Sequence, residues 1–327
     1  MTDRAIARSP DRPINGVLVI DKPAGPTSHD VVARARRALR EKRIGHTGTL
    51  DPMATGVLPL VIGKATRLAA MLSSTEKAYD ASIRLGAVSD TYDAAGRLDP
   101  ADARVPAVDA AQVEEALAAF RGSFEQMPPP YSAKKVAGVP AYRLARKQQP
   151  TELSPVPVTV HELELLGVEE GLIRVRLVTS PGFYVRSLAH DLGARLGCGA
   201  HLEALRRTRA GRFGLEASLP LEDLERDTES ARSRLIPLEA LVPELPAVHL
   251  NARGAERASH GNFLRPEDLR ERGTVPDFAT PGTGPDFATP GTGPLGRRVR
   301  VFDQDGRLIA IADLGADGLL RPSIVLV

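Results

Sequence analysis

The sequence lacks the features of disulfide-bonded, secreted and membrane-spanning proteins. Its 327 residues include one cysteine, Cys198, which excludes a disulfide framework and fits a reducing cytosol. No apolar segment of the kind found in signal peptides follows Met1. No run approaches the roughly 18 apolar residues that a membrane span requires. We therefore expect a cytoplasmic protein without a membrane partner.

The motifs of several enzyme classes are also missing. Neither G-x-S-x-G nor a motif built around a nucleophilic cysteine occurs. Residues 56–66 suggest a phosphate-binding loop, but six residues separate their two glycines instead of four, and an alanine replaces the magnesium-binding hydroxyl. His190, Cys198 and His201 have no second pair of ligands near them in the sequence. We expect structural roles for these three and no metal site.

Composition and pattern indicate an α+β fold. The length predicts about two domains, and 42% hydrophobic with 26% charged residues is typical of a globular protein. Strands and helices do not alternate in a regular βαβ order. The expected strands include 16–21, 78–87 and 172–180, and the expected helices include 28–41, 108–122 and 185–197. Thr27 with Asp30, and Asp109 with Gln112, have the spacing of helix-capping boxes.

One aspartate stands in an unusual segment, GHTGTLDPMATGVLP at residues 45–59. Its glycines and prolines disfavour helices and central strands, so we expect an ordered loop. Asp51, in the middle, is either a turn former or cap, or a functional carboxylate beside an arginine at the edge of a basic groove. In the second case the guanidinium would lower the pKa of Asp51 and fix its orientation.

Basic residues gather in three segments, although the formal net charge is only +2. Residues 31–43 hold six Lys/Arg and one acid, residues 131–149 hold five and none, and residues 205–212 hold four arginines and none. Each segment alone could be a solvated helix face. Together, the three favour a nucleic-acid partner.

The rest of the chain suggests a leader, a boundary and a second domain. Residues 1–15 are expected to be a flexible leader, and the prolines at 237–246 suggest a domain boundary. Beyond it, alternating segments around Asp305-Gly306 predict a hairpin in a small β-rich domain. The sequence PDFATPGTG occurs twice in tandem at 276–293, which we interpret as a duplicated flexible loop.

Five segments carry a resemblance to a known family. They are GVLVIDKPAGPTSHDVV, GHTGTLDPMATGVLPLVIGKATR, KAYDASIRLGAVSDTYDAAG, PGFYVRSLAHDLG and GAHLEALRRTRAGRF. In this order they resemble the motifs of the bacterial TruB family, the tRNA pseudouridine-55 synthases. The resemblance implies a catalytic domain over 16–245, with a mixed sheet, flanking helices and a basic thumb-like insertion at about 124–152. It also implies a PUA-like RNA-binding domain over 246–327.

The resemblance implies a reaction as well. Family members isomerise uridine 55 in the T-loop of tRNA to pseudouridine, after flipping the base and without a cofactor. Asp51 matches the catalytic aspartate, which either attacks C1′ or abstracts a 2′ proton. Tyr79 matches a tyrosine that stacks on the uracil and assists proton transfer at C5. Arg186 matches the arginine that pairs with the aspartate.

Further residues are implied as RNA contacts. His46 matches a histidine beside the flipped nucleotide, Tyr184 a substrate-contacting tyrosine, and Leu205 an apolar contact to the base, which we expect on a helix. Lys22 matches a KP motif that is structural or near the site. Each of these could instead be a purely structural residue. The residues expected to bind the RNA backbone are Lys134, Lys135, Arg143 and Arg146.

Three alternatives to a stand-alone enzyme remain open at this level. One is a relative that works in a guide-RNA ribonucleoprotein, although the thumb-like insertion and short tail argue against it. Another is a non-catalytic RNA chaperone that folds tRNA. The third is a hydrolase that releases uracil or sugar. We expect a monomer that binds the T-arm stem-loop of tRNA without a guide RNA, a metal or an obligate protein partner.

Overall fold

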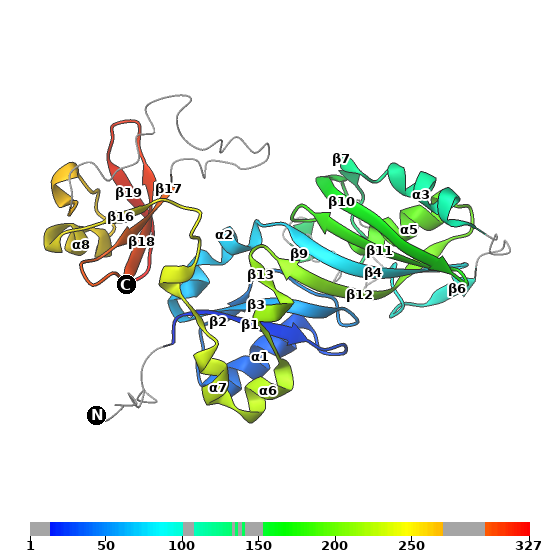
Figure 1. The fold of residues 1–327 in the computed structure, drawn as a ribbon, viewed down its shortest axis with the longest axis horizontal. Helices are drawn as coiled ribbons and strands as arrows, with labels where there is room; N and C mark the ends of the chain where they lie inside the picture. The colour runs from blue at the N-terminus through cyan, green and yellow to red at the C-terminus, as the bar shows by residue number, and fades with distance from the viewer. Residues whose placement is uncertain (1–13, 101–107, 133–134, 137–138, 141–152, 271–297) are drawn as a thin grey trace.

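Two sheets organise the chain. The computed structural model describes residues 14–100, 108–132, 135–136, 139–140, 153–270 and 298–327. In this part of the chain an 11-stranded sheet forms the larger body, and a four-stranded sheet lies at the other end of an elongated molecule (Figure 1). Within the described residues no helix is long and apolar enough to cross a membrane.

The large sheet contains both parallel and antiparallel strand pairs, which confirms the expected α+β class. Its main path runs β14-β1-β3-β12-β4-β11-β10-β7, and the pairs β1–β14 and β3–β12 are parallel. The strands of this path are, in chain order, β1 (Gly16–Lys22), β3 (Thr55–Ile62), β4 (Lys77–Leu85), β7 (Gly122–Gln126), β10 (Val156–Glu169), β11 (Leu172–Thr179), β12 (Ala200–Ala210) and β14 (Ser218–Pro220). Three short strands pair outside it: β2 (Ile44–His46), β13 (Phe213–Gly214) and β15 (Ile236–Pro237).

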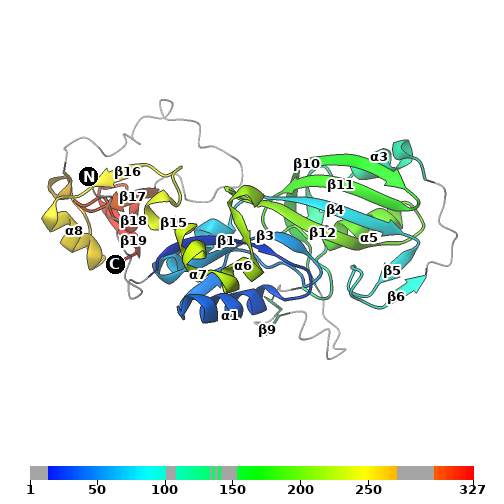
Figure 2. The same ribbon diagram turned by 60° about the horizontal axis from the view of Figure 1, so that its bottom comes forward.

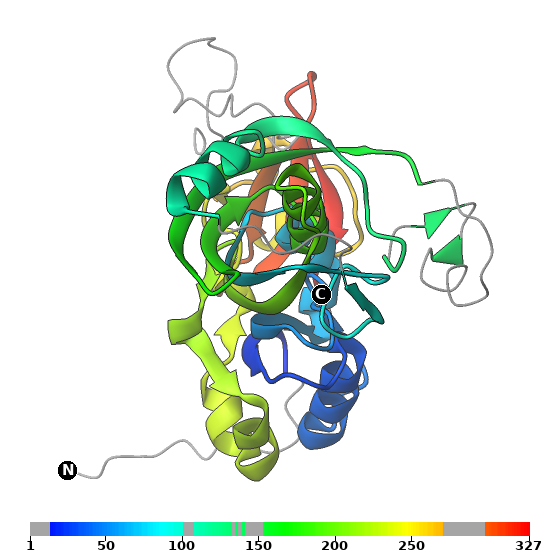
Figure 3. The same ribbon diagram turned by 90° about the vertical axis from the view of Figure 1, so that its right-hand side faces the viewer.

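Helices pack on one face of this sheet. They are α1 (Ser28–Leu39), α3 (Ala110–Ala118), α5 (Val185–Arg195), α6 (Leu221–Arg226) and α7 (Thr228–Ser233). All five contribute to one apolar core with the sheet, and Figures 2 and 3 show α1 beside α6 and α7 under β1. Both expected capping boxes are present, at Thr27 and Asp109. Helix α1 ends two residues earlier than expected, because Arg40 adopts a left-handed conformation with φ 54°.

The opposite face of β1 and β3 packs against the C-terminal part of the chain. Val17, Val19, Val57 and Val61 share an apolar cluster that reaches Ile311. Between them lie η1 (Gly63–Leu68) and α2 (Ala69–Ser73). The four-stranded sheet consists of β16 (Ala247–His249), β17 (Arg298–Phe302), β18 (Leu308–Leu314) and β19 (Leu320–Val325), with α8 (Ala252–Ser259) beside it.

The C-terminal hairpin is confirmed. Strands β17 and β18 are antiparallel neighbours, and Gly306 between them has φ 75°, as a tight turn requires. The leader and the tandem repeat at 276–293 lie outside the described residues, apart from positions 14 and 15. The remaining strands form two small ladders, β5 (Ala87–Ser89) with β6 (Leu98–Pro100), and β8 (Lys135–Val136) with β9 (Val139–Pro140).

The expectation of a loop throughout residues 45–59 is wrong at both ends, since Gly45 and His46 belong to β2. Residues from Thr55 onward enter β3, a central strand, even though it contains Gly56 and Pro59. The carbonyl of Pro59 accepts a hydrogen bond from the amide of Thr47, just beyond the end of β2. The missing amide hydrogen of this proline faces the same side, so no bond to β1 is lost.

The predicted helix at Leu205 is also wrong, since residues 200–210 form strand β12 between β3 and β4. Pairing on both sides overrides the local pattern. The arginines of residues 205–212 differ in exposure: Arg206 and Arg209 keep partly exposed side chains and Arg212 is exposed. Arg207 is buried, Arg206 pairs with Asp21 and Arg209 lies near Glu76.

Candidate active site

The backbone around Asp51 is held from both sides. The Ser28 hydroxyl accepts a hydrogen bond from the amide of Leu50 (2.8 Å) and donates one to its carbonyl (3.1 Å). After Asp51, the buried ammonium of Lys22 donates to the carbonyls of Pro52 (3.1 Å) and Ala54 (2.7 Å). These contacts tie the loop to α1 and β1, so the position of Asp51 is fixed by the rigid part of the fold.

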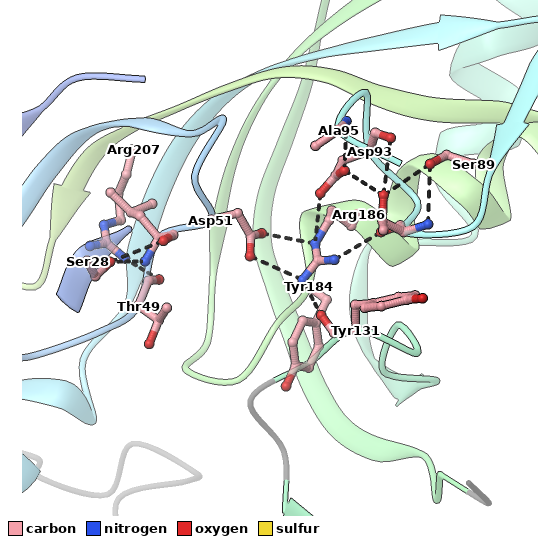
Figure 4. A network of polar contacts seen from close by, with 12 residues as sticks. Ser28, Thr49, Asp51, Ser89, Asp93, Ala95, Tyr131, Tyr184, Arg186 and Arg207 are labelled. Atoms are coloured by element: carbon pink, nitrogen blue, oxygen red, sulfur yellow. Dashed lines mark hydrogen bonds and ion pairs between the residues drawn. The ribbon is translucent and has the colours of Figure 1, made fainter. Parts of the chain in front are cut away.

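The structure brings Arg186 to Asp51, as expected (Figure 4). Nε of Arg186 lies 2.9 Å from Oδ2 of Asp51, and one terminal nitrogen donates to Oδ1 at 3.2 Å. Arg186 lies in the first turn of α5, and its side chain also donates to the carbonyls of Thr91 and Tyr131, both at 2.9 Å. A planar guanidinium can make all of these contacts at once.

Burial sets the charge balance of Asp51. Removal from water raises the pKa of its carboxyl, Arg186 and Lys22 oppose this rise, and Asp93 adds to it. The guanidinium of Arg186 lowers this pKa, as expected, but desolvation is the larger effect, so the net shift of the pKa is upward. The Asp51 side chain still keeps 31% exposure, so one side of the carboxylate is accessible from solvent.

Asp93 is a member of the site that the sequence did not single out. Its carboxylate accepts hydrogen bonds from the Thr91 hydroxyl (2.7 Å) and the Ala95 amide (3.0 Å). Its other oxygen lies 3.7 Å from Nε of Arg186. The residues around it, TYDAAG, are typical of a turn. Nothing in that pattern indicates that the turn faces α5.

Tyr79 lies in β4 and is 9% exposed. Tyr79 is directly opposite Arg207 in the β4–β12 register, so the two side chains lie on the same face of the sheet. Burial raises the pKa of Tyr79, and Arg207 opposes the rise. Leu205 is buried two residues before Arg207. It also lines an open pocket of about 520 Å³ together with Met53, among other residues.

The two other expected substrate contacts occupy different surroundings. Burial, with smaller effects of His29 and Arg207, lowers the pKa of His46 to about 4. Its Nδ1 accepts a hydrogen bond from the Gly48 amide at 3.3 Å. Tyr184 precedes α5, and the Gln126 side chain bonds both its amide (2.8 Å) and its carbonyl (3.0 Å). His46 is thus an uncharged acceptor at neutral pH, and Tyr184 is held by its backbone.

Most of the predicted thumb-like insertion lies outside the described residues. Lys134, Arg143, Arg146 and the side chain of Lys135 lie outside the described residues. Residues 124–126 belong to edge strand β7, so the beginning of the predicted insertion is part of the main sheet.

His190 and Cys198, for which we expected structural roles, pack against other side chains. His190 stacks on Tyr92 with ring centroids 3.9 Å apart, and Cys198 is buried. No group of three or more His, Cys, Asp or Glu able to hold a metal ion occurs among the residues that the structure describes.

Comparison with known proteins identifies the family. Residues 36–185 match the model described as the TruB family pseudouridylate synthase N-terminal domain, and residues 186–243 match the tRNA pseudouridylate synthase B C-terminal domain. tRNA pseudouridine synthase B of Solibacter usitatus is 42% identical over 96% of this chain and all of the relative. The chain belongs to the TruB family. The TruB protein of Cupriavidus metallidurans is 40% identical over 98% of both chains.

The fold has solved counterparts. The structure of a Cbf5-Nop10-Gar1 complex contains a chain with a TM-score of 0.68 and 25% identity, which covers all of this chain and 91% of its own. An H/ACA ribonucleoprotein bound to a substrate RNA gives a TM-score of 0.67 at 24% identity and shows the same fold. As a TruB member, the chain is a tRNA pseudouridine synthase, which isomerises uridine to pseudouridine in tRNA.

Proposed function

We propose that this enzyme modifies uridine 55 in the T-loop of tRNA and that Asp51 is the carboxylate that acts on the ribose. The observation that carries the proposal is the two-point contact between Asp51 and Arg186, on a loop held by Ser28 and Lys22. It supplies one oriented, accessible carboxylate. Hydrolysis of a glycosidic bond commonly needs two such groups, whereas an isomerisation adds no water and needs one.

The chemistry requires access to the ribose inside the T-loop. The uridine is first flipped out of its stack. The C1′–N1 bond then breaks, the uracil turns and C5 bonds to C1′. Whether Asp51 attacks C1′ or removes a 2′ proton, it must be ionised when it acts. The guanidinium of Arg186 favours that form and holds the oxygens in place.

The other residues take supporting roles in this proposal. Tyr79 stacks on the uracil and accepts the C5 proton, and Leu205 contacts the base. His46 and Tyr184 contact the flipped nucleotide and its neighbours. Lys134, Lys135, Arg143 and Arg146 bind the RNA backbone. The catalytic domain extends to about residue 245 and is followed by a PUA-like RNA-binding domain.

We further propose that the enzyme works alone, as a cytoplasmic monomer without cofactor, metal or guide RNA. Its similarity to TruB relatives extends over nearly the full length of both chains, which supports a stand-alone enzyme over a guide-RNA assembly.

The test uses a T-arm stem-loop transcript with wild-type protein, Asp51→Asn, and Asp99→Asn as a control, without added metal or cofactor. Asp99 is exposed and pairs with Arg97. Pseudouridine is mapped by chemical labelling and reverse transcription. We expect modification at the T-loop uridine by wild type and Asp99→Asn alone.

Other outcomes would contradict the proposal in distinct ways. Activity of Asp51→Asn would exclude the assigned carboxylate. Tight binding without modification by any protein would favour a chaperone or a missing guide partner. Released uracil would indicate a hydrolase.

A further inference from the structure

Arg207 is a buried cation without a carboxylate partner. It is 1% exposed, and within the described part of the chain it forms no ion pair, whereas Arg206 and Arg209 on the same strand lie near Asp21 and Glu76. Taking a guanidinium out of water without a counter-charge is costly. Because this cost is retained in the fold, we look for a role of the positive charge of Arg207 or of its several hydrogen-bond donors.

The donors of Arg207 converge on the segment before Asp51. Nε donates to the carbonyl of Val57 at 2.7 Å, and the terminal nitrogens donate to the carbonyls of Gly48 (3.0 Å) and Thr49 (3.4 Å). Figure 4 shows this guanidinium beside Thr49, on the other side of Asp51 from Arg186. One side chain therefore fixes the start of the loop and the strand that follows it.

The same guanidinium reaches Tyr79. The two residues are directly opposite each other in the β4–β12 register, so their side chains are neighbours on one face of the sheet, and Arg207 opposes the rise in the pKa of Tyr79. Arg207 is thus the shared neighbour of the Asp51 loop and of the aromatic ring.

The backbone is built to admit Arg207 at this place. Arg207 is also paired with Gly56 of β3, which has φ 100°. A Cβ at Gly56 would lie 2.2 Å from the carbonyl oxygen of Arg207, so only glycine allows this approach. At Gly48 a Cβ would lie 3.5 Å from Nη1 of Arg207, in ordinary contact.

We propose that Arg207 is a positioning residue for the isomerisation, holding the Tyr79 oxygen against the Asp51 loop and stabilising negative charge on it. This rests on the proposed function. When C5 has bonded to C1′, the Tyr79 phenol first gives its proton to water, a loss that burial opposes and Arg207 favours. The C5–H bond then breaks, its proton goes to the Tyr79 oxygen and Tyr79 is neutral again. The electron pair forms the C5–C6 double bond, the C6–N1 π pair moves to N1, and N1 takes a proton from water.

The first test needs no RNA. Tyrosines are replaced by 3,5-difluorotyrosine, whose phenol ionises at lower pH, and ¹⁹F NMR follows each ring as pH rises. Tyr79→Phe assigns the Tyr79 signal. In Arg207→Gln this signal should titrate at higher pH than in wild type, by about one unit or more. In Arg209→Gln, the control on the same strand, it should not move. An unmoved signal in folded Arg207→Gln overturns the proposal.

The second test measures single-turnover rate and RNA affinity separately on the T-arm stem-loop. Arg207→Gln should lose about tenfold or more in rate, with little change in affinity, and Arg207→Lys should recover part of the rate. A rate loss that only follows the folded fraction or the affinity would indicate a structural role and overturn the proposal.

Arg207→Lys keeps the test decisive if Arg207→Gln does not fold. An ammonium cannot reproduce the fork of contacts, so a folded Arg207→Lys with both wild-type rate and wild-type Tyr79 titration would also overturn the proposal. If the wild-type enzyme does not modify the T-arm stem-loop, the proposed function is wrong. The ¹⁹F titration would still show whether Arg207 lowers the pKa of Tyr79.

Discussion

Arg186 and Asp51 are 135 positions apart in the chain, yet they meet in a two-point contact with Nε–Oδ2 at 2.9 Å and a terminal nitrogen–Oδ1 at 3.2 Å. Only a planar guanidinium can keep this geometry while also bonding two carbonyls. The contact links the first turn of α5 to the loop between β2 and β3.

Replacing Arg186 with lysine keeps the charge and removes the fork. We expect Arg186→Lys to lose about tenfold to a thousandfold in single-turnover rate, since a point charge cannot hold both oxygens of Asp51 and the Thr91 and Tyr131 carbonyls. RNA affinity should change little. Arg226→Lys, on the exposed helix α6 beside Asp223, serves as the control and should behave as wild type.

The pH dependence of the rate should respond to Asp93. Asp51 must be ionised to act, and burial together with Asp93 raises its pKa, so the rate falls on the acid side. Asp93→Asn removes a negative charge, which lowers the pKa of Asp51 and moves the acid limb to lower pH. The profile of kcat/KM decides this, with Asp99→Asn as the control. A limb that moves to higher pH would contradict the assignment.

RNA binding should not depend on protonation of His46. Its pKa is lowered to about 4, so the ring stays neutral from pH 5 to 8. We expect wild type and His46→Gln to show the same pH dependence of T-arm affinity over that range, by fluorescence anisotropy. Loss of a binding step near pH 6 in His46→Gln would show that the ring is charged when it meets RNA.

Gly56→Ala should destabilise the enzyme more than replacement of a glycine that also has positive φ but has open space where its Cβ would lie. Gly197 also has positive φ, but a Cβ there meets nothing within 4 Å, whereas at Gly56 it meets the Arg207 backbone. Left-handed strain costs about 1–3 kcal/mol, and we expect Gly56→Ala to exceed Gly197→Ala by a further 1 kcal/mol or more, about the cost of overpacking. Urea unfolding of both variants measures the difference. Equal losses would mean that β3 and β12 can separate freely.

Lys22 should make stability depend on alkaline pH. Burial lowers its pKa from 10.5 to about 8, so between these values the unfolded chain binds more protons and the free energy of unfolding rises with pH. Lys22→Met should flatten this slope by up to about 1.4 kcal/mol per pH unit, the value for one proton. Lys77, with a pKa also lowered to about 8, is present in both proteins. An unchanged slope would mean that the Lys22 ammonium is exposed to water in the folded protein.

Local sequence was sufficient for some features and insufficient for others. Capping boxes at Thr27 and Asp109 act within four residues, so their spacing predicted both helix starts. Leu205 was misplaced because β12 is a strand by virtue of its neighbours, β3 and β4, which no local pattern reveals. Asp51 and Arg186 were matched through family motifs. The roles of Arg207 and Asp93 could not be predicted. The burial of Arg207 and the position of Asp93 opposite α5 both depend on contacts between segments that are distant in the sequence.

The segment that leads into the insertion is attached to the catalytic helix at several points. The Gln126 side chain bonds both backbone groups of Tyr184, Ser187 donates to the Met127 carbonyl at 2.7 Å, and Arg186 donates to the Tyr131 carbonyl. These hydrogen bonds couple the position of residues 126–131 to the position of Arg186. A displacement of residues 127–131 by a few tenths of an ångström would have to lengthen a bond to Arg186 or turn its guanidinium. A movement of this segment would therefore be transmitted to the carboxylate of Asp51 through the side chain of Arg186.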